Sequence, residues 1–257
     1  AIQNRGFRFA DGFFETIRVV FGKAQHLPLH YQRLTNSLQA HRIKPTSGFS
    51  FTAFSLAIAA LIDANELNEG GRIRVTFIRD GSGRYTPNSN GLLWIAESET
   101  LKRNEFILNE KGLTVDLFSE MKKHVDPLAN FKNIAASIYI QASIWAQENN
   151  LDDVLISNEQ NHIIESSHSN LFLVSNGVLY TSGLDGGPVG GVMRATIINI
   201  ALANKFKVFE CNLNPQELLQ ADELFLSNAI NGIQWVASYR TKRFYNKTAR
   251  ELTRLIN

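Results

Sequence analysis

Apolar and polar positions follow two different periods in the first hundred residues. Every second residue is apolar in 72–79, which predicts a half-buried strand, whereas apolar residues recur at helical spacing in 29–41. Residues 13–20 are rich in β-branched and aromatic side chains and end at a turn, Phe21-Gly22-Lys23. The patterns predict strands at 13–20, 72–79 and 92–97 and helices at 29–41 and 51–65.

Shorter elements alternate irregularly in the rest of the chain. The predicted strands are 113–118, 153–157, 171–174 and 178–181, and the predicted helices are 132–148, 192–204, 215–220 and 245–256. A polar stretch precedes them and is typical of a linker. The sequence therefore predicts an α+β fold with a smaller N-terminal α+β domain at 1–101, an interdomain linker at 102–111 and a larger C-terminal α+β domain at 112–257.

Composition and charge exclude several classes of protein. The 257 residues include 26 basic and 24 acidic side chains, and a net charge of +2 gives no reason to expect binding to nucleic acid or to a membrane surface. The densest basic run, Lys122-Lys123-His124, is interpreted as a solvated face. The apolar stretch 49–62 is too short to span a bilayer. The single cysteine, Cys211, excludes an intramolecular disulfide and favours the cytoplasm.

Lys132 is the strongest candidate for chemistry. It lies at the start of the predicted helix 132–148, where the helix dipole opposes a cation and is expected to lower its pKa. A lysine of this kind offers a neutral amine, which imine chemistry requires. Glu165 follows later in the chain as a carboxylate that could act with it.

Two further features suit a phosphate group. Gly190-Gly191 precedes the predicted helix 192–204, and free N–H groups at a helix N-terminus bind phosphate well. Arg33 flanks the apolar face of helix 29–41, from which its guanidinium can bind a phosphate with two hydrogen bonds. Neither feature is specific alone, and no metal site is predicted.

Six short motifs, in order along nearly the whole chain, resemble the class IV aminotransferases, the fold-type IV pyridoxal phosphate enzymes. This family includes branched-chain and D-amino-acid aminotransferases and 4-amino-4-deoxychorismate lyase. Each motif is weak alone, but six in order are specific. The motifs are Asn4 to Thr16, His30-Tyr31-Gln32-Arg33-Leu34, the segment around Lys132, Glu165 to Phe172, Gly190 to Arg194, and Ala221-Asp222-Glu223 through Ser227-Asn228-Ala229.

The resemblance implies a two-domain D-amino-acid aminotransferase-like fold, whose C-terminal domain carries the lysine, and pyridoxal 5'-phosphate as cofactor. Lys132 would form an imine with the cofactor aldehyde and then shuttle the substrate proton. Glu165 would keep the ring nitrogen protonated. The implied cofactor-binding residues are Arg33, Glu165, Ser166, Ser167, Gly191, Val192, Met193, Asn228 and Ala229, and the implied substrate-binding residues are Phe9, Arg84, Tyr85 and Ile230.

The chain departs from the family at several small residues. Ala10 adds a methyl group where a glycine often faces the substrate, and Ala135-Ala136 occupy positions where relatives commonly carry Asn-Tyr near the cofactor. Tyr139, one turn further on, could substitute for that tyrosine. Ala229 replaces a threonine that many relatives place on the phosphate.

Three functions remain open at this level. The first is a pyridoxal phosphate-dependent class IV aminotransferase that acts on an amino acid, a small-molecule substrate. The second is a 4-amino-4-deoxychorismate lyase, which releases pyruvate and 4-aminobenzoate, and a minor third is a non-catalytic binding protein with the same fold. The resemblance also implies a homodimer with its active site near the interface.

Overall fold

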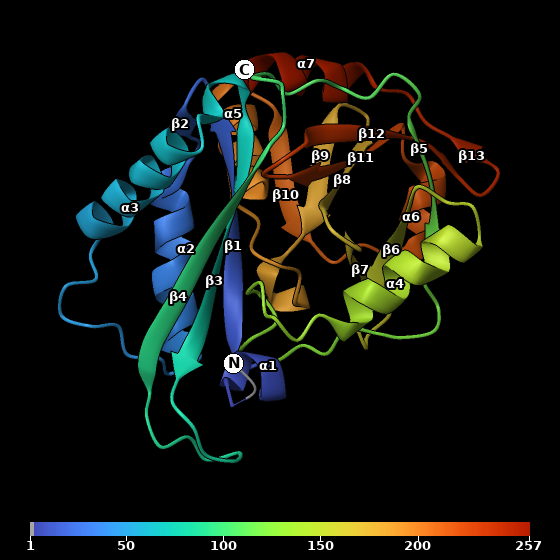
Figure 1. Cartoon of the computed structure of the whole chain (residues 1–257). Helices are drawn as coiled ribbons and strands as arrows, with labels where there is room; N and C mark the ends of the chain where they lie inside the picture. Colours follow the sequence, from blue (N-terminus) through green and yellow to red (C-terminus); the bar gives the residue numbers. More distant parts are fainter. Residues whose placement is uncertain (1–2) are drawn as a thin grey trace. The chain divides into compact units, whose positions relative to one another are not determined.

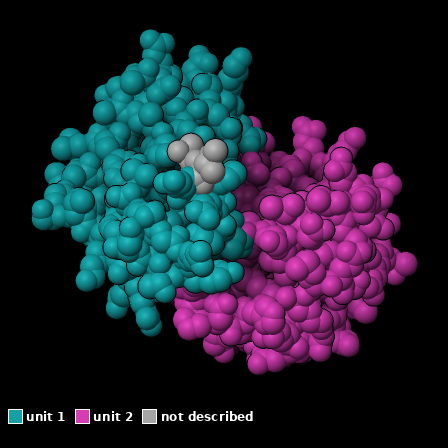
Figure 2. Space-filling view, turned by 60° about the horizontal axis from the view of Figure 1, so that its bottom comes forward, with its two compact units in different colours: residues 1–105, 131–135 teal, residues 106–130, 136–257 magenta. Residues whose placement is uncertain are grey.

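The computed structural model describes residues 3–257, which divide into two compact units. Unit 1 extends to Glu105 and includes Phe131–Ala135, and unit 2 comprises Phe106–Asn130 and Ala136–Asn257 (Figure 2). The domain boundaries expected from the sequence remain a prediction. By its contacts, the short segment that contains Lys132 groups with unit 1 and not with the C-terminal part of the chain.

Unit 1 is built on a four-stranded antiparallel sheet with the strand order β2-β1-β3-β4 (Figure 1). Its elements are α1 (Arg5–Phe9), β1 (Gly12–Val20), β2 (Lys23–Ala24), α2 (Leu27–Ala40), α3 (Phe51–Ala64), the 3₁₀ helix η1 (Leu67–Glu69), β3 (Gly71–Asp80) and β4 (Gly91–Thr100). The predicted strands and helices of this part are all present, and α1, β2 and η1 are additions.

Alternation along the strands gives this sheet one apolar face. Phe13 and Ile17 of β1 are fully buried together with Phe77 of β3. They pack against Leu34 of α2 and Phe54 of α3, so the two helices cover this face and form one core. Burying these side chains is the main contribution to the stability of the unit.

A short extended segment occupies the free edge of β1. Phe14 N–H donates to the carbonyl of Lys132 (2.8 Å), and Ile134 N–H donates to the carbonyl of Gly12 (3.1 Å). At this point a Cβ on Gly12 would lie 2.2 Å from the Phe77 carbonyl oxygen on the neighbouring strand. The lack of a side chain on Gly12 therefore allows the close approach of the three segments.

Ala10 has a conformational explanation in this structure. It ends α1 with φ +51° and ψ +35°, in the left-handed region that favours glycine. The glycine that relatives often carry at this position is therefore explained by the backbone, in addition to any effect of the methyl group on substrate.

Unit 2 contains the remaining elements. They are β5 (Leu113–Leu117), α4 (Ser137–Glu148), β6 (Asp153–Ser157), β7 (Ile163–Ser166), β8 (Asn170–Ser175), β9 (Val178–Ser182), the 3₁₀ helix η2 (Leu184–Gly186), α5 (Val192–Ala203), β10 (Lys207–Cys211), α6 (Pro215–Gln220), β11 (Glu223–Asn228), β12 (Gly232–Tyr239), β13 (Lys242–Arg243) and α7 (Lys247–Leu255). The expected α+β class is confirmed, with two separate sheets.

The strands of unit 2 form a closed ring of pairings. The sheet runs β10-β9-β8-β11-β12-β5-β6-β7, and β7 also pairs with β8, which joins six of the strands into a ring. A single register pair, Glu165 with Asn170, makes this closing contact. A closed sheet leaves few unpaired strand edges. No helix within residues 3–257 is long and apolar enough to cross a membrane.

The start of α7 is held by a buried carboxylate from the sheet. Glu223 of β11 accepts hydrogen bonds from Thr248 N–H (2.8 and 2.9 Å), from the Thr248 hydroxyl (2.9 Å) and from Ala249 N–H (3.1 Å). The N–H groups in the first turn of a helix have no partner within the helix. Glu223 therefore acts as a cap and anchors α7 on β11.

We predict that Glu223→Ala lowers the free energy of unfolding by about 2 kcal/mol or more, because it leaves buried N–H groups without acceptors. Urea denaturation followed by circular dichroism measures this change. Glu251→Ala, which removes an exposed glutamate from the same helix, is the matched control and should stay within about 0.5 kcal/mol of wild type. Equal effects of the two substitutions would contradict the capping role.

Candidate active site

Lys132 lies in the extended segment on β1, and its position corrects one expectation. The helix α4 begins at Ser137, after its N-cap Ala136, so Lys132 does not start a helix. Because a helix dipole acts within about its first turn, the predicted effect of the dipole on Lys132 does not apply. Instead, Lys132 Nζ lies over the ring of Phe14, 4.7 Å from the ring centroid.

A second cation shares the Phe14 ring. The guanidinium carbon of Arg74, on β3, lies 3.7 Å from the same centroid, a distance typical of a cation–π contact. Burial and the neighbouring charge of Arg72 lower the pKa of Arg74. Lys132 thus lies beside an aromatic ring that also holds a guanidinium, which is a favourable environment for an anionic ligand.

Glu15, His30 and Arg33 form a buried cluster in unit 1. Arg33 Nε donates to Glu15 Oε1 (2.8 Å) and Arg33 Nη2 donates to Glu15 Oε2 (2.5 Å), as a two-pronged ion pair. His30 Nδ1 lies 2.7 Å from Glu15 Oε2. Burial opposes the charge of Glu15, but Arg33 and His30 outweigh it and lower the pKa of Glu15 to about 2. The cluster fixes the predicted phosphate ligand Arg33 on α2.

His30 has one ring nitrogen available to a ligand. It is fully buried, and Nε2 has no hydrogen-bond partner among the described residues. Burial and the positive charges of Arg33 and Lys132 lower the pKa of His30 more than Glu15 raises it. His30 is therefore neutral near pH 7 and donates one N–H to Glu15.

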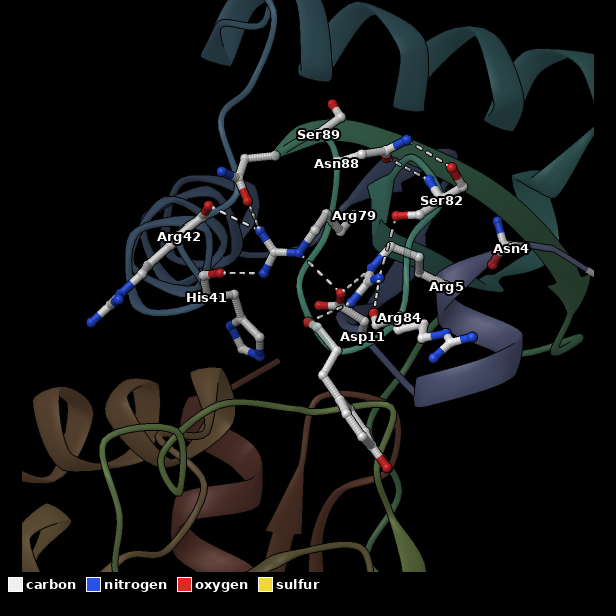
Figure 3. A network of polar contacts seen from close by, with 12 residues as sticks. Asn4, Arg5, Asp11, His41, Arg42, Arg79, Ser82, Arg84, Asn88 and Ser89 are labelled. Carbon is white, nitrogen blue, oxygen red and sulfur yellow. Dashed lines mark hydrogen bonds and ion pairs between the residues drawn. The ribbon is translucent and has the colours of Figure 1, made fainter.

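The predicted substrate residue Arg84 lies at one polar network of unit 1 (Figure 3). Asp11 Oδ2 accepts hydrogen bonds from Arg5 Nε (2.7 Å) and from Arg79 Nε (2.9 Å). These two arginines outweigh the effect of burial and lower the pKa of Asp11.

This network holds the loop that carries Arg84 and Tyr85. Arg5 Nη1 donates to the carbonyl of Arg84 (2.7 Å), and the exposed Tyr85 ring contacts the Phe9 ring at 5.8 Å. The structure therefore brings Phe9, Arg84 and Tyr85 together within unit 1, whereas the fourth predicted substrate residue, Ile230, belongs to unit 2.

Glu165 is the central polar residue of unit 2. It lies on β7, is 2 % exposed and accepts three hydrogen bonds. The donors are Lys123 Nζ (2.6 Å) and the Tyr139 hydroxyl (2.8 Å) to Oε1, and Val189 N–H (2.8 Å) to Oε2. Burial, the charge of Glu165 and this hydrogen bond raise the pKa of Tyr139, which stays protonated as a donor.

The solvated face expected for Lys122-Lys123-His124 is wrong at its central residue. Lys122 and His124 are exposed, but Lys123 is buried and forms an ion pair with Glu165. A basic run alone does not reveal which of its members has a buried partner far along the chain. The Tyr139 hydroxyl donates to Glu165, and whether Tyr139 substitutes for the family tyrosine stays a prediction.

Asn170 connects Glu165 to the start of α5. It is the register partner of Glu165, and its Nδ2 donates to the carbonyl of Val189 (2.7 Å). A Cβ on Gly191 would lie 1.8 Å from Asn170 Oδ1, so a larger residue there would require the Asn170 side chain to move. Gly191 is the N-cap of α5, and Val192 and Met193 form its first turn, as the sequence predicts. The N–H groups of this turn suit a phosphate.

Asn228 and Ser169 form a second part of the unit 2 site. Asn228 Nδ2 donates to Ser169 Oγ (3.0 Å), and Asn228 Oδ1 accepts from Ile230 N–H (3.0 Å) in the turn that contains Ala229. Beside them, Ser227 Oγ is buried and has no partner among the described residues. A bound polar group could supply that partner.

Ser166 and Ser167 have local structural roles. Ser166 Oγ accepts from Ser169 N–H (3.1 Å) within the turn between β7 and β8. Ser167 Oγ donates to Asp153 Oδ1 (2.6 Å) and lies 2.8 Å from His168 Nδ1. The structure does not bring the Ser167 hydroxyl to Glu165, so any contact of Ser167 with a cofactor remains a prediction.

Each unit therefore carries groups that fit pyridoxal phosphate, which has an aldehyde, a ring nitrogen and a phosphate. Unit 1 offers the amine of Lys132, the guanidinium of Arg33 and the unpartnered His30 Nε2. Unit 2 offers the carboxylate of Glu165 and the N-terminus of α5 beside Gly191. Apart from His30 Nε2, these are the groups that the sequence leads us to expect in a fold-type IV enzyme that uses pyridoxal phosphate.

Comparison with known proteins identifies the family. Residues 12–239 match the family described as Amino-transferase class IV, and the chain belongs to this family. It is 25% identical over 237 residues to an aminodeoxychorismate lyase of Vibrio harveyi, covering 90% of this chain and 84% of that protein. It is also 27% identical over 272 residues to a D-alanine aminotransferase of Listeria innocua, covering 98% and 91%.

A solved structure supports the same fold. It is a Legionella pneumophila protein with a provisional assignment as 4-amino-4-deoxychorismate lyase. The TM-score is 0.91 at 26% sequence identity, with 100% of this chain and 94% of the other covered. The expected fold type and cofactor class are confirmed by these matches, which do not separate the two activities.

The buried Glu15 cluster predicts a pH dependence of stability. The pKa of Glu15 falls from its usual 4.5 to about 2 on folding, which corresponds to about 3 kcal/mol. This contribution is fully present above about pH 4.5 and is lost as the pH falls through about 2. Between about pH 4.5 and pH 2, the free energy of unfolding of Glu15→Gln should therefore fall by about 3 kcal/mol less than that of wild type. Denaturation at a series of pH values measures this difference.

The exposed Glu69→Gln is the matched control in the same unit. It should follow the wild-type acid profile. A Glu15→Gln profile parallel to wild type across this range would show that the cluster does not hold Glu15 ionised.

Proposed function

We propose that the chain is a pyridoxal phosphate-dependent aminotransferase that acts on an amino acid. The observation that carries this proposal is the buried Glu165 carboxylate, which accepts hydrogen bonds from Lys123 and from two further donors. A fixed carboxylate of this kind can keep a pyridine nitrogen protonated. The D-alanine aminotransferase of Listeria innocua, similar over 98% of this chain, supports the reaction class.

Each part of the cofactor has a proposed partner. Arg33 and the backbone of Val192 and Met193 would bind the phosphate, together with Gly191 and the turn at Asn228-Ala229. Glu165 would hold the ring nitrogen, with Ser166 and Ser167 supporting the turn beside it. Lys132 would hold the aldehyde carbon. When bound, the cofactor supplies an electron-withdrawing ring that stabilises the charge left at the substrate α-carbon.

Lys132 would move the proton in this reaction. Its Nζ takes the proton from the substrate α-carbon, as a general base. The Phe14 ring holds Nζ from one side, and Arg74 keeps the surroundings positive for a carboxylate substrate. Phe9, Arg84, Tyr85 and Ile230 are the proposed substrate contacts. We further propose a cytoplasmic homodimer.

A 4-amino-4-deoxychorismate lyase is the second candidate. The Vibrio harveyi and Legionella pneumophila relatives favour it. The same lysine and carboxylate would serve both activities, because both begin with loss of a proton from a carbon next to the amine. The bonds that break afterwards differ, so products separate the two candidates.

We predict that the loaded protein releases a keto acid from an amino acid. Adding L-glutamate, branched-chain L-amino acids or D-alanine separately should move the visible absorption band of the bound cofactor to the near ultraviolet. Pyruvate and 4-aminobenzoate from aminodeoxychorismate, with no such shift from any amino acid, would instead identify the lyase. A protein that binds no pyridoxal phosphate would contradict both.

A second experiment identifies the lysine. Borohydride treatment of the loaded protein should attach the cofactor to Nζ of Lys132, as mass spectrometry of peptides can show. Lys132→Ala should lose the label and lower turnover by roughly 10²- to 10⁴-fold. Lys123→Arg, which changes another buried lysine, is the control and should keep the label. A label on Lys123 would refute the assignment.

A further inference from the structure

The two oxygens of Glu165 have different surroundings. Oε1 accepts from Lys123 Nζ (2.6 Å) and from the Tyr139 hydroxyl (2.8 Å), whereas Oε2 accepts from Val189 N–H (2.8 Å). Each carboxylate oxygen offers about two acceptor positions. Oε1 therefore has both positions in use, and Oε2 retains one for a further donor.

Lys123 balances the charge of Glu165 in a buried setting. The side chain of Lys123 is 10% exposed and that of Glu165 is 3% exposed, and Lys123 Nζ also lies 5.3 Å from the centroid of the Tyr139 ring. Charges attract strongly where water is excluded. The ion pair therefore exists before any ligand arrives.

Within residues 3–257, the other hydrogen bonds and strand pairings of Glu165 are with uncharged groups. Its register partners are Ile156 on β6 and Asn170 on β8, and the loop before α5 contributes a backbone N–H from Val189. The α4 helix contributes the protonated hydroxyl of Tyr139. Asn158, which is uncharged, pairs with Lys123 through an isolated β-bridge of the backbone. Lys123 is thus the charged group that faces Glu165 from these elements.

We propose that Lys123 is a positioning residue that shares the charge of Glu165 and limits how strongly Glu165 holds a proton on the cofactor ring nitrogen. The inference rests on the proposed function, in which Glu165 binds that nitrogen through Oε2. Two cations would then share one carboxylate. Because like charges repel, Lys123 favours release of the proton from the ring. Lys123 thereby sets how strongly the ring withdraws electrons.

The test is the pH at which the ring nitrogen loses its proton, measured by ¹⁵N NMR of bound pyridoxal phosphate labelled at that nitrogen. Lys123→Gln keeps a donor for Oε1 but removes the charge. We expect the ring nitrogen in this variant to lose its proton at a pH about one unit or more above that of wild type. This shift corresponds to roughly tenfold tighter binding of the proton. Lys123→Arg, which keeps the charge, should follow wild type.

Two further variants keep the test decisive. Tyr139→Phe removes a neutral donor to the same oxygen while Lys123 remains, so its shift should be smaller than that of Lys123→Gln. Lys123→Met is a second charge-removing variant with an unbranched side chain, for use if Lys123→Gln does not fold. Circular dichroism checks the fold of each variant.

The outcomes separate the two ideas. If Lys123→Gln and Lys123→Met titrate at or below the wild-type pH, or shift no more than Tyr139→Phe, charge sharing is overturned and the proposed function stands. If the wild type binds no labelled cofactor, or Glu165→Gln leaves the titration unchanged, the role of Glu165 fails, and the inference about Lys123 fails with it.

Discussion

Burial of the Glu165 carboxylate is the constraint on which the proposed site in unit 2 depends. The closing pair of the strand ring places Glu165 where water does not reach it, so its charge requires partners from the protein. Lys123, Tyr139 and Val189 supply them from three separate segments. The closed sheet therefore holds the carboxylate where these three donors meet it.

Unit 1 applies the same principle through a different residue. Glu15 lies on the same face of β1 as the core residues Phe13 and Ile17 and points to the apolar side of the sheet. There Arg33 and His30 hold it ionised. The carboxylate in turn fixes the guanidinium that the proposed function assigns to phosphate. In both units a buried acid fixes the hydrogen-bond donors around it, one of which is a cation, so that these side chains are held in place by the protein itself.

Local patterns predict the elements well and the long-range contacts poorly. The helix over 192–204 is observed as Val192–Ala203, because its apolar spacing and preceding glycines are local signals. Lys132 was expected inside a helix, since the residues after it suit one. Instead, the edge of β1, more than a hundred residues earlier, captures residues 131–135. A tertiary contact of that kind overrides local propensity and leaves no sequence pattern.

The same reasoning explains which site residues the sequence reveals. Motifs identify residues such as Glu165 and Gly191, a buried carboxylate and a glycine packed closely against Asn170. Lys123 looks like any surface lysine, because its role is defined only by a carboxylate 42 residues away. Glu15 gave one usable signal, a charged residue at a core-facing position of an apolar strand. A charged residue at a strand position where the pattern predicts an apolar one indicates a buried partner. A charged residue within a basic run gives no such indication.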